Sequence, residues 1–314
     1  MALKLDTFND FHLHGASAPE WNQRYLQISP GAMCSSLAEA TGGGIHVFRK
    51  WMSERVVQQG CLPGGKICFA VPLRSPAGTP RIQGHELREN SVFILRSGSE
   101  FTLQRPQGME MLAVTFELDS FLRLLDARPW TPDTQALLSR SVLRAPIASV
   151  QRLRRVLLSL FDAPSSVNRS GSGPVKSSPA SLVVFYAICD LFDGAAASRQ
   201  SVGSASASFI VEQCHRIVAD SGDMIPSVGE LCIRLRTSRR SLQNSFRQVA
   251  DTTPLHYLRC TRLNAVRRQL MSTRAADLSI AQAAADRGFS HQSHFTERYN
   301  ALFAELPSQT QRYD

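Results

Sequence analysis

The pattern of apolar positions divides the chain into two parts with different periods. Between residues 24 and 117, short apolar or alternating segments are separated by breaks rich in glycine and proline. Such a pattern is typical of antiparallel strands, whose side chains point to opposite faces in turn. After residue 117 the apolar residues recur every three to four positions, which predicts helices. The expected strands are Tyr25–Ser29, Ile45–Trp51, Arg55–Gln59, Lys66–Val71, Ser91–Leu95, Glu100–Gln104 and Met111–Glu117.

The strand-rich part predicts an antiparallel barrel or sandwich with helices beside it. Two segments rich in small residues, 163–179 and 193–208, are expected to be linkers. The amphipathic helix Val150–Phe161 fits two roles equally, as a dimer interface or as a helix packed on the chain's own sheet. The helices expected before residue 208 are Asp6–Phe11, Asp119–Asp126, Thr134–Leu143, Val150–Phe161 and Leu182–Phe192.

Two stretches of the second half, Ser227–Val249 and Leu278–Tyr299, each have the pattern of a helix-turn-helix. In each, a short supporting helix is followed by a turn and by a second helix with one apolar face. A further helix, Leu255–Leu270, joins the two, and another, Phe209–Ala219, precedes them. The stripes expected to be buried are Leu242, Phe246 and Val249 in the first stretch and Phe295, Tyr299 and Leu302 in the second.

The turn of the second stretch has the residue types that a sharp turn between helices requires. Ala283 and Ala284 are small, so two helices can pack closely there. Gly288 lies where the supporting helix must end, and glycine adopts positive φ at little cost. Ser290 is expected to cap the helix that follows, His291–Phe303.

The exposed faces of the two second helices carry side chains that suit DNA. Arginine, glutamine and asparagine match the edges of guanine and adenine in the major groove, and arginine and histidine also bind phosphates. The predicted base contacts are Arg240, Gln243 and Asn244 in the first helix and Gln292, Ser293 and Thr296 in the second. The predicted phosphate contacts are Arg239, Arg247, His291 and Arg298. Glu297 is expected to accept from cytosine or to oppose phosphate, and His294 is either a further backbone contact or a surface histidine.

This part of the chain, from about Ser227 to Arg312, resembles the DNA-binding domain of AraC/XylS-type transcription regulators. The motifs that carry the resemblance are Ser238-x3-Leu242-x3-Phe246, Thr253-Pro254-x2-Tyr257-Leu258-x3-Arg262-Leu263, Gly288-Phe289, Ser293-x-Phe295 and Pro307-Ser308. Three positions depart from the family pattern. Asp251 and Ala304 stand where the family usually has glycine, and Val266 replaces a usual alanine.

The resemblance implies a small jelly-roll or cupin-like β-barrel as the N-terminal sensor domain. It also implies RNA polymerase as a partner and a homodimer. Two N-terminal motifs, Trp21-x2-Arg24-Tyr25 and Ser53-Glu54-Arg55-x2-Gln58-x-Gly60, are similar to those of ethanolamine-operon-type regulators. The expected division is a β-rich sensor and dimerisation domain (1–162), a linker with a helix at 182–192 (163–208), and a double helix-turn-helix domain (209–314).

A barrel of this size can enclose one small ligand. The candidate ligand-lining residues are Trp51, Phe69, Phe93, Phe101 and Phe116, although aromatic residues at strand spacing are also ordinary core residues. His46, Arg49 and His85 either orient a polar ligand or lie on the surface.

Composition narrows the partners and the compartment. The net charge of +9 and the pI of about 9.6 favour anionic partners. The seven cysteines are odd in number and include no Cys-x2-Cys pair, so we expect reduced thiols in the cytoplasm and no metal or cofactor. His12 and His14 form a His-x-His without a third ligand at a suitable spacing. No apolar run approaches the roughly 20 residues of a membrane span, and Met1–Phe11 lacks a signal-peptide core.

The sequence therefore predicts a bacterial transcription activator that binds double-stranded DNA and is controlled by a signal sensed in its N-terminal domain. The alternative is a regulator whose N-terminal domain binds a protein partner instead of a small metabolite. An enzyme is not expected, because the chain lacks a Gly-x-Ser-x-Gly motif, a phosphate loop, a His-Glu-x2-His motif and a metal-binding cysteine cluster.

Overall fold

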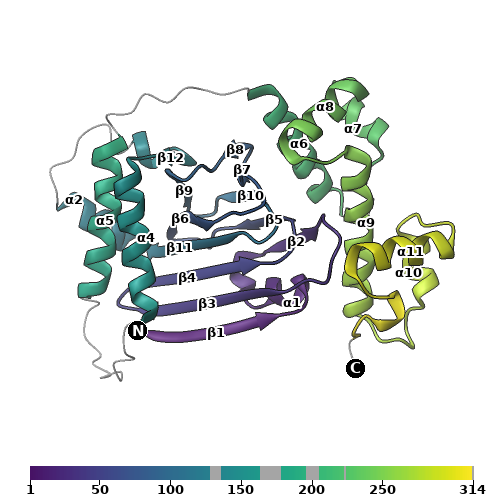
Figure 1. Cartoon of the computed structure of the whole chain (residues 1–314), viewed down its shortest axis with the longest axis horizontal. Coiled ribbons are helices and arrows are strands. Elements are labelled where there is room, and N and C mark those ends of the chain that lie inside the picture. Colours follow the sequence, from purple (N-terminus) through teal and green to yellow (C-terminus); the bar gives the residue numbers. More distant parts are fainter. Residues whose placement is uncertain (128–135, 163–177, 196–204, 223, 313–314) are drawn as a thin grey trace.

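The computed structural model describes residues 1–127, 136–162, 178–195, 205–222 and 224–312. These residues form a β-rich N-terminal unit, up to residue 195, and a helical C-terminal unit, from residue 205 onward (Figure 1). In Figure 1 the C-terminal unit lies on the side of the sheets away from α4 (Ile147–Asp162) and α5 (Pro179–Ala195).

The N-terminal unit contains two antiparallel sheets. The seven-stranded sheet has the order β1-β3-β4-β11-β6-β9-β12, and the five-stranded sheet has the order β2-β5-β10-β7-β8. The strands of the first are β1 (Ala2–Phe8), β3 (Ser35–Gly42), β4 (Ile45–Met52), β6 (Lys66–Arg74), β9 (Ser91–Arg96), β11 (Glu110–Glu117) and β12 (Val142–Arg144). Those of the second are β2 (Arg24–Gln27), β5 (Val56–Cys61), β7 (Arg81–Ile82), β8 (His85–Glu86) and β10 (Glu100–Arg105).

The alternation of side chains along β11 explains how the seven-stranded sheet is covered on both faces. Leu112, Val114 and Phe116 pack with the helices α2 (Leu118–Asp126), α4 and α5. Met111 and Ala113 belong instead to the core shared with the five-stranded sheet. A strand buried on both faces reads as a continuous apolar run, because successive side chains enter different cores.

The structure does not confirm the expected jelly-roll or cupin-like barrel. The two sheets lie face to face as open sheets, and no strand pair among the described residues joins one sheet to the other. The two sheets stay open because their edge strands pair with no further strand in the described ranges. β1 pairs with β3 alone, β12 has only three residues, and the free edge of β2 faces the C-terminal unit. Each of the seven expected strands nevertheless coincides with an observed strand to within a few residues.

Two expected helices of the N-terminal unit are wrong at least in part. The segment expected as a helix at Asp6–Phe11 is the end of β1 followed by a turn. Helix α1 (Phe11–Ala16) begins after this turn, and Asp10 is its N-cap: the Asp10 side chain accepts a hydrogen bond from the backbone nitrogen of His12. Of the helix expected at 134–143, residues 134 and 135 lie outside the described residues. Its last two residues belong to β12, which pairs with β9.

The remaining helices follow the expected pattern. Helix α5 packs on α4 and on the seven-stranded sheet, so the segment expected as a helix within the linker belongs to the core of the N-terminal unit. The expected linker residues 163–177 and 196–204 lie outside the described residues. The helices of the C-terminal unit are α6 (Ala205–Asp220), α7 (Val228–Arg234), α8 (Arg239–Ala250), α9 (Pro254–Met271), α10 (Ile280–Asp286) and α11 (Gln292–Phe303). A short 3-10 turn follows α11 at Pro307–Gln309, and another lies in the N-terminal unit at Pro19–Trp21. Within the described ranges, no helix has the length and apolar character that crossing a membrane would require.

Candidate nucleic-acid interface

Helices α7 and α8 form the first expected helix-turn-helix. The side chain of Ser227 accepts a hydrogen bond from the backbone nitrogen of Glu230, whose carboxylate accepts one from the backbone nitrogen of Ser227. This reciprocal pair satisfies the free N–H groups at the start of α7. Ser238 caps α8 in the same way, through the backbone nitrogen of Ser241 at 3.0 Å. The sequence thus sets where each helix begins.

Helix α8 has the two faces that its sequence predicts. Leu242, Phe246 and Val249 are buried in the core of the C-terminal unit. The opposite face is exposed along its whole length, at Arg239, Arg240, Gln243, Asn244 and Arg247. Within the described residues, none of these three arginines forms an ion pair, so their guanidinium groups are available to an external anion.

Helices α10 and α11 form the second unit. Ala283 and Ala284 are fully buried, and Gly288 has a φ of 80°, as a sharp turn between helices requires. One expectation is wrong: the N-cap of α11 is His291, with extended backbone and no side-chain hydrogen bond, and not Ser290. The chain stays extended one residue longer than predicted, so the helix starts at Gln292.

The exposed face of α11 is more mixed in charge than that of α8. Phe295, Tyr299 and Leu302 are buried, as predicted. Thr296 is half-buried, and the other candidate contacts are exposed, namely His291, Gln292, Ser293, His294, Glu297 and Arg298. His294 Nδ1 lies 4.0 Å from the Glu297 carboxylate, and both side chains are well exposed. Such an exposed pair contributes little stability and leaves both groups free to rearrange against a ligand.

Helix α9 joins the two units as a rigid support. Thr253 caps it through the backbone nitrogen of His256, and Pro254 occupies its first position, where a missing N–H costs nothing. Along its 18 residues it buries side chains on several sides, because it packs against α7, α8 and α10. The relative position of α8 and α11 is therefore held by one continuous helix.

The family profile described as "Helix-turn-helix domain" matches residues 231–313, which include all four of these helices except the first three residues of α7. Residues 231–313 are a helix-turn-helix domain. The match agrees with the sequence prediction of AraC type for this part of the chain.

Relatives of known function match a part of the chain. "XylDLEGF operon transcriptional activator 3" from Pseudomonas putida is 34% identical over 115 residues, which are 37% of this chain and 34% of that protein. "HTH-type transcriptional regulator CdhR" from Pseudomonas aeruginosa is 39% identical over 80 residues, 26% of this chain and 23% of that protein. The chain thus matches about a third or less of the length of these relatives. They are transcription regulators and not enzymes.

Solved structures give a looser likeness over a longer stretch. The AraC-like transcriptional activator CuxR is 13% identical, with 83% of this chain and 94% of that chain covered and a TM-score of 0.42. ToxT from Vibrio cholerae O395 is 12% identical, with 93% and 96% covered and a TM-score of 0.29. The similarity of the N-terminal motifs to ethanolamine-operon-type regulators stays a prediction.

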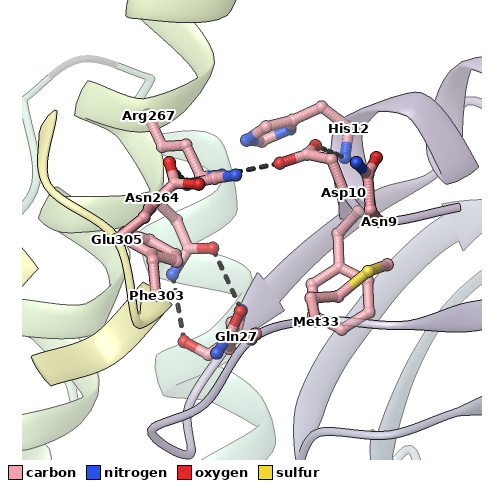
Figure 2. A pocket seen from close by; sticks show the side chains of 11 residues that line it. Asn9, Asp10, His12, Gln27, Met33, Asn264, Arg267, Phe303 and Glu305 are labelled. Atoms are coloured by element: carbon pink, nitrogen blue, oxygen red, sulfur yellow. Dashed lines mark hydrogen bonds and ion pairs between the residues drawn. The ribbon is translucent and has the colours of Figure 1, made fainter. Parts of the chain in front are cut away.

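The helix-turn-helix domain is docked on the N-terminal unit through α9. Asp10 and Arg267 are both nearly buried, and Arg267 Nε donates to the Asp10 carboxylate at 2.6 Å. Arg267 Nη1 also donates to Glu305 at 2.5 Å. Figure 2 shows this group beside the junction of Gln27 with Asn264, around a cavity of about 170 Å³. The sequence pattern does not reveal this junction, since its residues lie more than 200 positions apart.

The C-terminal ends of both α8 and α11 are bonded to the N-terminal unit. The carbonyl oxygen of Leu302 accepts from Gln27 Nε2 at 2.8 Å and from the backbone nitrogen of Gly31 at 3.1 Å. At the end of α8, Arg55 Nη1 donates to the carbonyl oxygen of Asp251 at 3.2 Å. Free carbonyls at a helix C-terminus attract donors and positive charge, so both contacts satisfy groups that the helices leave open.

The inside of the β-sandwich contains a polar cluster that sequence reasoning does not single out. Lys50 Nζ donates to the Tyr25 hydroxyl at 2.8 Å and to Gln23 Oε1 at 3.1 Å. Arg105, which is fully buried, donates to the carbonyl oxygens of Lys50 and Met109. Burial, together with the nearby charge of Arg105, lowers the pKa of Lys50 to about 7. His14 donates to or accepts from Ser35 Oγ at 2.6 Å, and burial lowers its pKa to about 2.

The five aromatic residues expected to line a ligand site do not come together. Phe69 and Phe116 lie in the core under the helices, and Phe93 and Phe101 lie in the core between the sheets. Trp51 is half-buried in β4, where its neighbours Lys50 and Met52 point to the opposite face of the sheet. None of the five lines either of the two cavities described below. Of the polar candidates, His46 pairs with Glu39 at 2.9 Å, Arg49 pairs with Glu110, and His85 is exposed.

Proposed function

We propose that this protein is a sequence-specific DNA-binding transcription regulator, and an activator, whose N-terminal unit controls the helix-turn-helix domain. Helices α8 and α11 are its two recognition helices, and they enter successive major grooves on one face of DNA, about 34 Å apart. The observation that carries the proposal is the pair of exposed polar faces on α8 and α11, both attached to α9. RNA polymerase as a partner rests on the family resemblance.

The residues divide into base and phosphate contacts. Arg240, Gln243 and Asn244 in α8 reach base edges, since guanidinium and amide groups pair with guanine and adenine there. Gln292, Ser293 and Thr296 do the same in α11. The predicted phosphate contacts are Arg239, Arg247, His291 and Arg298, with Glu297 accepting from cytosine or opposing phosphate.

The first experiment is capture and sequencing of genomic fragments by the full chain at physiological salt. We expect discrete peaks that share a two-part, directly repeated motif spanning about two turns of DNA. Capture that depends on salt but yields no motif would contradict sequence-specific binding, because phosphate contacts alone give such behaviour.

A matched pair of substitutions in α8 then tests the assignment. Gln243→Ala should cost about 1–3 kcal/mol against the captured site, with the effect confined to one base pair. Gln248→Ala, on the same helix but outside the predicted contacts, is the control and should bind as the unaltered protein does. A loss for Gln243→Ala that is equal on all DNA sequences would show a phosphate contact only.

The N-terminal unit also presents apolar side chains that fit a protein partner. Val183 and Tyr186 on α5 are 54% and 52% exposed, and Ile147 at the start of α4 is 41% exposed. Exposed apolar groups on adjacent helices are typical of an interface. We propose that this helical face joins two copies of the chain into a dimer. Light scattering of Val183→Glu should then report a monomer, while Glu117→Lys, an exposed change elsewhere, should remain dimeric.

A further inference from the structure

Two cavities lie between the N-terminal unit and the helix-turn-helix domain. Of these two, only the second is lined by buried polar atoms that have no hydrogen-bond partner among the described residues. In the first, Arg267 bonds to Asp10 and Glu305 (Figure 2). None of its lining side chains has a buried polar atom without a partner among the described residues. This cavity is complete without a ligand.

The second cavity, of about 180 Å³, lies between the outer face of the five-stranded sheet and the C-terminal end of α8. Its lining includes Arg55, His215 and Tyr257, and each of these has a buried polar atom with no hydrogen-bond partner within the described residues: Arg55 Nε, His215 Nδ1 and the Tyr257 hydroxyl. A buried polar group without a hydrogen-bond partner destabilises the fold, and such groups are rare in native proteins. Arg105 also lines this cavity and adds two such atoms, Nε and Nη1, and the four side chains together indicate that a polar group from outside the chain completes them.

The proton on the His215 ring is placed by its neighbours. The ring is fully buried, and burial lowers its pKa to about 3, so it is neutral at ordinary pH. Its Nε2 lies 3.3 Å from Gln104 Nε2, an amide nitrogen that can only donate. The ring therefore accepts at Nε2 and carries its proton at Nδ1. Both Arg55 Nε and His215 Nδ1 are thus donors.

One part of the lining is apolar. Ile28 and Val57 from the sheet side and Val249 from α8 form the walls, and the Tyr257 ring packs edge-on against His215 with 4.7 Å between ring centroids. A dry cavity of about 150 Å³ is large enough to hold benzene. A cavity of this size and lining suits a compact apolar body of six or so carbon atoms.

We propose that this cavity binds a small organic acid, with its compact apolar part against Ile28, Val57 and Val249 and its carboxylate accepting hydrogen bonds from Arg55 and His215. The Asp251 carboxylate, which lies 3.5 Å from Arg55, is 99% exposed, so this ion pair is weak and can be exchanged for a desolvated ligand carboxylate. Arg105 belongs both to this lining and to the polar cluster inside the sandwich, whereas none of the five aromatic residues expected to line a ligand site lines this cavity.

The position of the cavity lets the bound ligand affect DNA binding, an inference that rests on the proposed function. Asp251 is the C-cap of α8, and its carbonyl oxygen accepts from the same guanidinium group that the ligand would engage. A ligand that binds more tightly in one arrangement of α8 and the sheet shifts the population toward that arrangement. Ligand binding and DNA affinity are then linked reciprocally.

The test is calorimetric titration of the full chain, without DNA, with hexanoate and cyclohexanecarboxylate and with the amide of each. We expect saturable binding of at least one acid and at least tenfold weaker binding of its amide. Ala77→Trp should weaken acid binding at least tenfold, because Ala77 lies on an exposed loop at the cavity and a tryptophan there fills the space without entering the core. Ala77→Ser is the matched control and should bind as the unaltered chain does. Thermal melting of both variants verifies that they fold.

Two results would overturn the proposal: no binding of either acid at concentrations up to about 10 mM, or equal binding by Ala77→Trp and Ala77→Ser. An amide that binds as well as its acid would overturn the carboxylate assignment. DNA affinity is measured separately with and without the acid. Failure of the proposed function appears as an absence of specific DNA binding while the acid still binds, so the two failures are distinguishable.

Discussion

Gln27 in β2 and Asn264 in α9 exchange two hydrogen bonds across the junction between the two units. The backbone nitrogen of Gln27 donates to Asn264 Oδ1 at 3.0 Å, and Asn264 Nδ2 donates to the carbonyl oxygen of Gln27 at 3.0 Å. β2 is the edge strand of its sheet, and a free edge offers unpaired N–H and C=O groups. The amide of Asn264 pairs with these groups as a neighbouring strand would, and so a helix closes the sheet.

Asn264→Ala should loosen this junction. The substitution leaves the N–H and C=O of Gln27 buried without partners, at a cost of about 1–3 kcal/mol. We expect faster amide hydrogen exchange at residues 25–29, with the core of the seven-stranded sheet unaffected, as measured by mass spectrometry. Asn300→Ala, an exposed change on α11, is the control. Unchanged exchange in β2 would mean that other contacts hold the junction closed.

Ala304→Gly should stabilise the protein. Ala304 ends α11 in the left-handed region, with φ 55°, at a position where related domains usually have glycine. This conformation costs a residue with a β-carbon about 1–2 kcal/mol, which exceeds the extra entropy that glycine loses on folding. We expect a gain of roughly 1 kcal/mol in the free energy of unfolding, from chemical denaturation. Ala301→Gly, inside the same helix, should have the opposite sign and lose about 1 kcal/mol.

Lys50→Met should stabilise the protein most at low pH. The pKa of Lys50 is about 7 in the folded protein, below its ordinary value of 10.5, so the unfolded chain binds more protons between these two values. The stability of the unaltered protein therefore rises as the pH rises from 7 toward 10.5, and the full penalty is present below 7. One pKa unit corresponds to about 1.4 kcal/mol, so the advantage of Lys50→Met at pH 6 should be a few kcal/mol.

That advantage should shrink as the pH is raised from 6 to 9. Denaturation curves at four or more pH values measure it. Lys66→Met, at the start of β6 and outside the polar cluster, is the control. A difference between Lys50→Met and the unaltered protein that stayed constant with pH would show that the pKa of Lys50 is the same in the folded and the unfolded chain.

Arg247→Ala should weaken DNA binding equally on all sequences. Its guanidinium is exposed on α8 and is predicted to contact phosphate, so its removal should lower the slope of log K against log salt by about 1. Fluorescence anisotropy over a series of salt concentrations measures this slope. Arg96→Ala, exposed at the end of β9 in the N-terminal unit, should leave the slope unchanged. A loss confined to one base pair would instead make Arg247 a base contact.

The helix boundaries and the buried faces of the helix-turn-helix domain can be predicted from the sequence, because local apolar patterns and capping residues determine them. Leu242, Phe246 and Val249 must face the core, and Ser238 and Thr253 must cap the helices that follow them, so boundaries and faces emerge from local residues. The same holds for strands buried on both faces, such as β11. The departures at Asp251 and Ala304 change the energy of the two turns and not their geometry, since both residues adopt the left-handed conformation.

The rest depends on contacts between distant residues. β1 has Leu3 and Leu5 on an exposed edge, 42% and 70% accessible, so no buried face imposes a pattern on it. β3 reads Ser-Ser-Leu-Ala-Glu-Ala-Thr-Gly, with few residues that favour strands, and is held by its two neighbours. The cover over the free edge of β2 and the cavity at His215 likewise depend on how α6 and α9 pack against the five-stranded sheet. No local sequence pattern encodes this packing.

The hydrogen bonds from the N-terminal unit to the ends of both α8 and α11 fix the distance and the orientation between these two helices. With Gln27 held to Leu302 and Arg55 held to Asp251, α8 and α11, the two proposed recognition helices, keep one spacing and one rotational phase. DNA turns once in about 10–10.5 base pairs, so an insertion of about five base pairs between the two half-sites would place them on opposite faces of the duplex. Both helices could then reach their sites only after these contacts had opened, and the sharpness of that preference for spacing measures how firmly the two units are joined.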